Sequence, residues 1–251
     1  MATVLSGTSG ALYYKPAGTL GTFAPANVNT SSEVITVAPF LNFKVGDPVK
    51  FSVVNSATGG SGTGTLPAGI SAGTIYFVIS YTASSGELKV SATSGGSALD
   101  LTNVGTAVSP NEFQVAYSDF EAVGEVQQWN LSIERENIDI TTIGQTVNQG
   151  VPFKTFIAGF ADGSGGATVF VTDEDTTLAN RLIEDVTMRN QVGAAFKLYQ
   201  DKQSTEALSR SIAMDAVLTS AEFNVNPDDA QSVEIEFKPT KAPEFDYSTS
   251  S

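Results

Sequence analysis

The sequence of 251 residues contains no cysteine and no histidine. These absences exclude disulfides, thiolate nucleophiles, zinc sites built from Cys and His, serine triads that need an imidazole, and histidine pH switches. Carboxylates, hydroxyls, lysine and arginine are the chemically active groups that remain. Because cysteine is the residue that reports the redox compartment, its absence leaves that compartment open.

Basic residues are also scarce. The chain has 13 lysines and arginines against 27 acidic residues, which gives a net charge of −14. A field of this sign repels phosphates, so the composition argues against a protein that holds nucleic acid by its backbone. It favours solubility, or a surface past which polyanions slide without binding.

Long hydrophobic runs are missing as well. No apolar stretch approaches the roughly 20 residues that a membrane-spanning helix needs. Residues 1–7 lack the basic and apolar regions of a secretory signal. We therefore expect synthesis in a cytoplasm and no membrane insertion.

The acidic residues are unevenly distributed along the chain. Residues 31–117 contain five acidic and three basic residues, whereas residues 118–251 contain 22 acidic and nine basic ones. The first of these segments is rich in Gly, Ser, Thr and Val, and turn residues separate its short β-rich runs. The runs are 33–38, 49–54, 74–81, 87–91 and 112–117. This spacing predicts a small all-β module.

From residue 119 onward the pattern predicts longer, half-buried antiparallel strands and one helix. Trp129, Leu131 and Ile133 alternate with polar residues, and the run 232–238 alternates in the same way. Apolar residues of 178–186 recur at steps of three and four, which indicates one amphipathic helix. Further strand candidates are 153–158, 167–172, 194–199, 209–218 and 222–225.

Three polar clusters could carry chemistry, and a structural role is favoured for each. The spacing of Asp173–Asp175 lacks the alternating ligands of a calcium loop and favours helix capping. Gly163–Gly166 lacks the Lys-Ser/Thr ending of a phosphate-binding loop and favours a hairpin loop. Glu134, Glu136 and Asp139 could form a glycosidase pair, but the chain has a single Trp for sugar stacking, which favours solvated acids. The sequence thus predicts no catalytic, metal or cofactor site.

The order of the strand patterns carries more information than any one motif. The relevant pieces are Ala11–Lys15, Gly124–Ile133, Ile138–Gly144, Phe153–Gly165, Ala167–Asp173, Ala194–Tyr199, Ala216–Ser220, Phe223–Val225 and Val233–Phe237, with the turn Asp228–Ala230 before the last one. In this order and spacing the chain resembles the major tail tube proteins of long-tailed (siphovirus-like) bacteriophages. Within residues 31–117, the runs Gly46–Val49, Leu66–Ile70 and Thr74–Val78 resemble Ig-like modules of phage structural proteins.

The resemblance implies a mainly β fold: a tail-tube-type β-sandwich or partial barrel with one flanking α-helix, plus a small all-β Ig-like insertion. The tube core would comprise residues 1–30 and 118–251. The insertion would comprise residues 31–117 and lie on the outside of the tube, where it leaves the channel open.

The resemblance also implies a structural role without catalysis or cofactor. Homo-hexameric rings would stack head to tail into a hollow tube in the virion tail, assembled in the bacterial host cytoplasm. Its acidic lumen would conduct DNA during ejection. Tape measure, tail tip or baseplate, and terminator proteins would be partners. Open alternatives are another ring component, such as a contractile-tail tube or a terminator, and a carbohydrate-binding two-domain β protein.

Two sets of residues are expected to serve assembly and conduction. The candidate lumen acids are Glu234 and Glu236, with Glu134 and Glu136 as further candidates. By the same resemblance, the segment 141–151 is expected to reach a neighbouring subunit or ring. Its candidate residues are Thr141, Gln145, Thr146, Asn148, Gln149 and Gly150.

Overall fold

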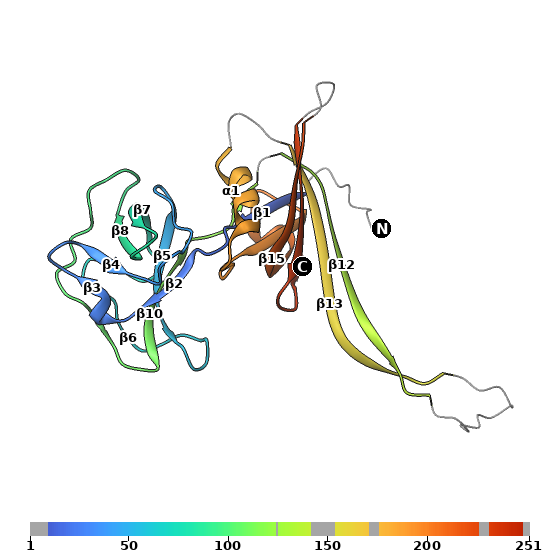
Figure 1. Cartoon of the computed structure of the whole chain (residues 1–251), viewed down its shortest axis with the longest axis horizontal. Helices are drawn as coiled ribbons and strands as arrows, with labels where there is room; N and C mark the ends of the chain where they lie inside the picture. Colours follow the sequence, from blue (N-terminus) through green and yellow to red (C-terminus); the bar gives the residue numbers. More distant parts are fainter. Residues whose placement is uncertain (1–9, 124, 142–153, 171–175, 226–230, 248–251) are drawn as a thin grey trace.

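A computed structural model describes residues 10–123, 125–141, 154–170, 176–225 and 231–247. The protein is mainly β, its sheets are antiparallel, and the described residues contain one α-helix. Two β units lie side by side with the helix α1 between them, and a long hairpin projects from one unit (Figure 1). None of the described helices has the length and apolar character to cross a membrane. The expected mainly β fold with one helix is confirmed.

The first unit is built on an eight-stranded antiparallel sheet. Its hydrogen-bonded order is β11 (Glu121–Ala122), β1 (Ala11–Lys15), β14 (Ala195–Asp201), β15 (Arg210–Asn224), β16 (Ser232–Pro239), β13 (Phe156–Phe170) and β12 (Glu125–Asp139), and β17 (Glu244–Tyr247) pairs with β15. The sheet folds over on itself, because the Phe196 ring of β14 stacks on the Phe237 ring of β16 with 4.4 Å between centroids. The apolar faces of the two layers form one core.

The second unit contains a seven-stranded sheet with its own core. The order is β2 (Leu20–Phe23), β10 (Asn111–Tyr117), β5 (Pro48–Asn55), β7 (Ile75–Thr82), β8 (Glu87–Ser91), β4 (Val34–Thr36) and β3 (Val28–Asn29), beside a small pair β6 (Gly64–Thr65) and β9 (Thr106–Ala107). The sheet boundary therefore differs from the expected boundary at residue 31. Strands β2 and β3 lie before that residue and pair within this second sheet, because β2 satisfies the outer edge of β10.

The alternation in the sequence matches the faces of the strands. In β16, Val233, Ile235 and Phe237 are buried, while Glu234 and Glu236 are exposed. Trp129 and Leu131 of β12 pack against the same core. The helix α1 spans Thr176–Thr187, and Leu182 from its apolar stripe is fully buried. Residues 173–175, expected to cap this helix, lie outside the described residues.

The expected hairpin loop at Gly163–Gly166 is wrong. These residues lie inside β13, which merges the separate runs 153–158 and 167–172 into one strand of 15 residues. The glycines serve packing rather than turning: a Cβ at Gly165 would overlap the Phe237 ring of the neighbouring strand. The runs 209–218 and 222–225 likewise merge into β15.

A buried arginine joins the two units. Arg181 of α1 is 1 % exposed, and its Nη1 donates to Asp47 Oδ1 at 2.7 Å. Its Nη2 donates to the carbonyl oxygen of Asn42, and its guanidinium lies 5.7 Å from the centre of the Tyr117 ring. These three partners, Asp47, Asn42 and Tyr117, belong to the second unit. The helix of the first unit therefore contacts the second unit through Arg181.

One turn further along the helix, Asp185 extends this junction. Its carboxylate accepts hydrogen bonds from Asn42 Nδ2 at 2.5 Å, from the Tyr14 hydroxyl at 2.8 Å and from the backbone amide of Ala17 at 2.9 Å. Burial raises the pKa of the Asp185 carboxyl, and the hydrogen bonds oppose that shift. An exposed ion pair between Lys44 and Glu184 lies beside the network.

We predict that Arg181→Ala lowers the free energy of unfolding by about 3–5 kcal/mol, because it leaves the Asp47 carboxylate buried without its cation. Urea titration followed by the fluorescence of the single Trp129 measures this change. The matched control is Arg210→Ala, at an exposed strand position, with an effect of at most about 0.5 kcal/mol. Equal effects of the two changes would show that the junction contributes nothing specific.

Candidate assembly surfaces

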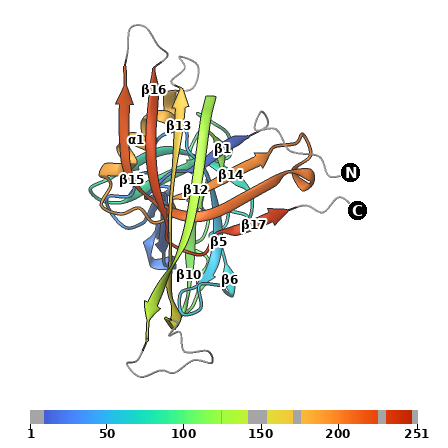
Figure 2. The same ribbon diagram turned by 90° about the vertical axis from the view of Figure 1, so that its right-hand side faces the viewer.

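One face of the first unit carries a row of carboxylates. It belongs to the four neighbouring strands β15, β16, β13 and β12, which lie side by side in Figure 2. By strand register, Glu234 and Glu236 share this face with Glu222 of β15, Asp162 of β13 and Glu134 of β12. Lys238 is the basic residue of this face. The other positions include the small or polar residues Gln128, Asn130, Ser132, Ser164, Gly166, Thr168 and Ser220. We call this surface the acidic face.

Like charges lie directly opposite one another on the acidic face. Glu222 pairs with Glu234 across β15 and β16, and Glu134 pairs with Asp162 across β12 and β13. Such pairs are destabilising, by roughly 0.2–1 kcal/mol each. Lys238 partly offsets them through an exposed ion pair with Asp162 at 3.6 Å. The fold thus keeps a negative face at some cost to its own stability.

The structure brings three of the four expected lumen acids together and extends the set. Glu234, Glu236 and Glu134 lie on the acidic face, whereas Glu136 lies further out on the hairpin, where its side chain approaches Gly159. The sequence reasoning missed Glu222 and Asp162. Alternation within 218–225 and 161–168 could have identified these two acids. It was missed because each of β15 and β13 was expected as two separate runs.

The four-stranded segment has an open edge on each side. The outer edge of β12 has no strand partner within the described residues. At the other side, β14 covers one edge of β15 only from Arg210 to Asp215. Strands β16 and β17 pair with the opposite edge of β15. The edge that β14 covers at 210–215 therefore has no strand partner along residues 219–224 within the described part of the chain.

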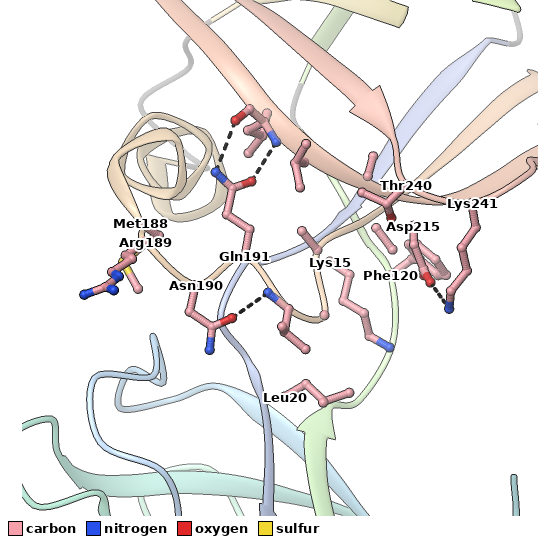
Figure 3. A pocket seen from close by; sticks show the side chains of 17 residues that line it. Lys15, Leu20, Phe120, Met188, Arg189, Asn190, Gln191, Asp215, Thr240 and Lys241 are labelled. Atoms are coloured by element: carbon pink, nitrogen blue, oxygen red, sulfur yellow. Dashed lines mark hydrogen bonds and ion pairs between the residues drawn. The ribbon is translucent and has the colours of Figure 1, made fainter. Parts of the chain in front are cut away.

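A glutamine side chain marks where this open edge begins. Gln191 Oε1 accepts from the backbone amide of Leu218 at 2.8 Å, and Gln191 Nε2 donates to the Leu218 carbonyl at 3.1 Å. The amide therefore occupies both backbone groups that a neighbouring strand would use at this position (Figure 3). Edge groups beyond Leu218 remain available for pairing.

The hairpin of β12 and β13 extends beyond the sheet. Strand β16 pairs with β13 only from Gly165 to Phe170, so residues 131–141 and 154–164 form a two-stranded extension, which we call the arm. Its large exposed apolar side chains are Ile133, Ile138, Ile140, Phe156, Ile157 and Phe160, the last of them 87 % exposed. An isolated two-stranded ribbon is marginal in water, and an exposed apolar patch of this kind is typical of an interaction site.

Only the base of the expected inter-subunit loop is described. Thr141 is exposed; its amide donates to Asp139 Oδ1 at 2.9 Å, and its Oγ1 accepts from the amide of Thr155 at 2.8 Å. The hydrogen bonds from Thr141 lower the pKa of the exposed Asp139 carboxyl. The other expected residues, Gln145, Thr146, Asn148, Gln149 and Gly150, lie outside the described residues.

A groove of about 980 Å³ lies where β1, β15 and the segment after α1 meet. Lys15 extends into its middle, between Gln191 and the ion pair of Asp215 with Lys241 at 2.6 Å (Figure 3). Arg189 lies at the far end, and apolar lining comes from Leu20, Phe120, Val192 and Val217. Burial lowers the pKa of the Lys15 amine. No group of three or more Asp and Glu among the described residues is placed to hold a metal ion.

Comparison with known proteins gives only distant similarity. The sequence matches no protein-family model and no curated protein. Among solved structures, it is similar to a chain from the virion of a native gene transfer agent particle, with a TM-score of 0.37, 16% identity, and coverage of 50% of this chain and 88% of that chain. A chain from the tail of an empty gene transfer agent particle, refined with C6 symmetry, gives a TM-score of 0.37, 17% identity, and coverage of 50% and 85%.

We predict that Glu222→Gln raises the free energy of unfolding by about 0.2–1 kcal/mol, because it removes the charge opposite Glu234. The gain should shrink as salt screens the exposed pair. Urea titrations at low and high salt measure both effects. Glu87→Gln is the matched control, because Glu87 lies opposite threonines in both neighbouring strands. An equal gain in the control would assign the effect to net charge alone.

Proposed function

We propose that this protein is the structural subunit of a phage tail tube, in which rings of six copies stack into a hollow conduit for DNA. The observation that carries the proposal is the four-stranded segment β15–β16–β13–β12, which combines two open edges with an acidic face. The strand order that resembles tail tube proteins supports the same function. Catalysis and cofactors play no part in it.

Ring closure follows from the two open edges. The edge of β12 and the edge of β15 at 219–224 lie on opposite sides of the same four strands. The two edge strands run in opposite directions, so β12 of one copy can pair antiparallel with β15 of the next. Such a contact joins two different surfaces and is heterologous, which closes into a ring when the rotation allows it. It also removes both exposed edges, which otherwise invite aggregation.

A ring of six copies would be wide enough to enclose an aqueous channel. Six copies of the four-stranded segment would form a barrel of about 24 strands, with a backbone diameter of about 50 Å at a strand spacing of about 4.8 Å and a tilt of about 40°. Barrels of about 16–18 strands already enclose an aqueous channel. The apolar side of the four strands is covered by β1 and β14 of the same chain. The part of the acidic face outside the arm, with Glu222, Glu234 and Glu236, is therefore the side that would line the channel.

The mechanism is passive repulsion. Carboxylates on the channel wall repel the phosphate backbone, and Lys238 on the same face is paired with Asp162. The wall therefore offers DNA little gain from counterion release. DNA therefore stays centred and slides. In this assembly the opposed acids destabilise each subunit slightly, but they prevent DNA from binding to the wall along the whole tube.

The remaining parts have structural roles in the same proposal. The arm, with the loop that follows Thr141, contacts a neighbouring copy, and head-to-tail stacking extends the rings into a filament in the virion tail. The second unit is an Ig-like module on the tube exterior. Tape measure, tail tip or baseplate, and terminator proteins contact the ends of the tube, and assembly takes place in the host cytoplasm.

Electron microscopy of the concentrated full-length protein tests the assembly. We expect hollow tubes with six-fold end views and lateral projections from the second unit. A protein that stays monomeric at every concentration would contradict the proposal. Closed rings that never stack would favour a terminator over a tube subunit.

We predict that tubes of Glu234→Lys/Glu236→Lys retain short duplex DNA, whereas unmodified tubes let it pass. Retention should fall steeply with salt, because lysines on the wall bind by counterion release. Sedimentation of labelled DNA with preformed tubes measures it. Glu87→Lys/Asp100→Lys makes the same charge change at exposed positions of the second unit. Equal retention by both variants would place the acidic face outside the channel.

A further inference from the structure

We propose that the groove around Lys15 is the receptor for the arm of a second copy of this chain. This inference rests on the proposed tube and adds the surface that receives the arm. The occupant is defined by the charge, the apolar surface and the strand register of the two sites.

The groove is a positive site on a strongly negative protein. Lys15, Arg189 and Lys241 face one acid, Asp215, while the whole chain carries a net charge of −14. Asp215 is already paired with Lys241, and neither Lys15 nor Arg189 has an ion pair within the described residues. Lys15 is half-buried over the Phe120 ring, with 5.8 Å from Nζ to the ring centre. Asp119 and Asp215 lie near enough to favour the charge of Lys15, but neither forms an ion pair with it. A half-buried amine whose charge is only partly compensated is suited to accept a further carboxylate from outside.

The arm offers the complementary groups. Glu134 and Glu136 are exposed and, in the described part of the chain, form no ion pair, whereas Asp139 and Asp162 are paired with lysines. Exposed isoleucine and phenylalanine side chains surround these acids on the arm. The groove supplies apolar lining from Leu20, Val192 and Val217. Both the charges and the apolar surfaces of the two sites therefore match.

The strand register brings the arm to the groove. Leu131, Gly165, Phe237 and Leu218 lie in one row across the four strands. Glu134 lies three residues beyond this row on β12, as Asp215 does on β15. Asp215, Ala195 and Lys15 form the row that continues across β14 and β1. A neighbouring β12 that pairs along 219–224 therefore directs its arm, which carries Glu134 and Glu136, toward the row of Lys15. The tilt of the proposed barrel displaces the register between copies by a few residues, which the length of the arm accommodates.

Gln191 lies at the boundary between the edge of β15 that can pair with a neighbouring strand and the groove that would receive the arm. Its amide occupies the Leu218 backbone, and β14 covers β15 from Asp215 downward. A neighbouring β12 can therefore pair along 219–224 but must leave the sheet edge at Leu218. The groove begins at this position, since Leu218 and Gln191 both line it. Gln191 thus ends edge pairing where the arm enters the groove.

Cysteine crosslinking tests the contact, because the chain has no native cysteine. The full-length variant Glu134→Cys/Val192→Cys places one thiol on the arm and one at an exposed groove position. Treatment of assembled protein with a short bifunctional maleimide should give a ladder of covalent oligomers. Glu134→Cys/Val108→Cys, with the second thiol at an exposed site of the second unit, should give none. Tubes that form without a ladder, or with equal ladders in both variants, would overturn arm docking and leave the tube itself intact.

A charge exchange gives an independent measurement. Lys15→Glu and Glu134→Lys should each raise the concentration needed for half-maximal assembly by about tenfold, because each places like charges together. The double exchange should restore most of the loss. Additive losses would overturn the contact, since two residues that do not meet cannot compensate. Absence of assembly in the unmodified protein would overturn the proposed function and the docking together.

Discussion

The buried contact of Arg181 with Asp47 determines how the whole chain is arranged. It joins a helix of one β unit to a loop of the other, and the side chains of Tyr14, Asn42 and Asp185 complete a hydrogen-bonded network around it. Two charges removed from water are stabilised only by close pairing and further hydrogen bonds, which reach both Nη atoms of Arg181 but not its Nε. The relative position of the two units is therefore as specific as a core contact.

Around that junction, the first unit separates an apolar side from an acidic side. The same four strands bury Val233, Ile235 and Phe237 and expose Glu222, Glu234 and Glu236. A monomer gains nothing from acids placed opposite one another on neighbouring strands. Open edges at both ends of these strands are a further liability for a monomer. In the proposed ring the edges pair with those of neighbouring copies, and the acids repel a polyanion from the wall.

The sequence predicted much of the local structure because strand periodicity depends on neighbouring residues only. Alternation identified β16 and the first half of β12, and the apolar stripe of 178–186 identified the existence of α1. Glycine misled the prediction at 163–166, where the chain stays extended to make room for Phe237. Residues 20–29 were expected in the first unit, but β2 and β3 pair within the sheet of the second unit. The pairing of β2 with β10 joins residues far apart in sequence, so no local pattern indicates it.

Composition by itself determined the excluded chemistry and the sign of the surface, because absent residue types cannot act and charges sum whatever the fold. The order of residues along the chain also determined which face of each strand is polar. Only the tertiary structure decided which polar residues share one surface, since strand register placed Glu134 and Asp162 on the same face as Glu234. It alone placed Lys15 in a groove and Gln191 on the Leu218 backbone. Such contacts depend on long-range pairing, which no local pattern encodes.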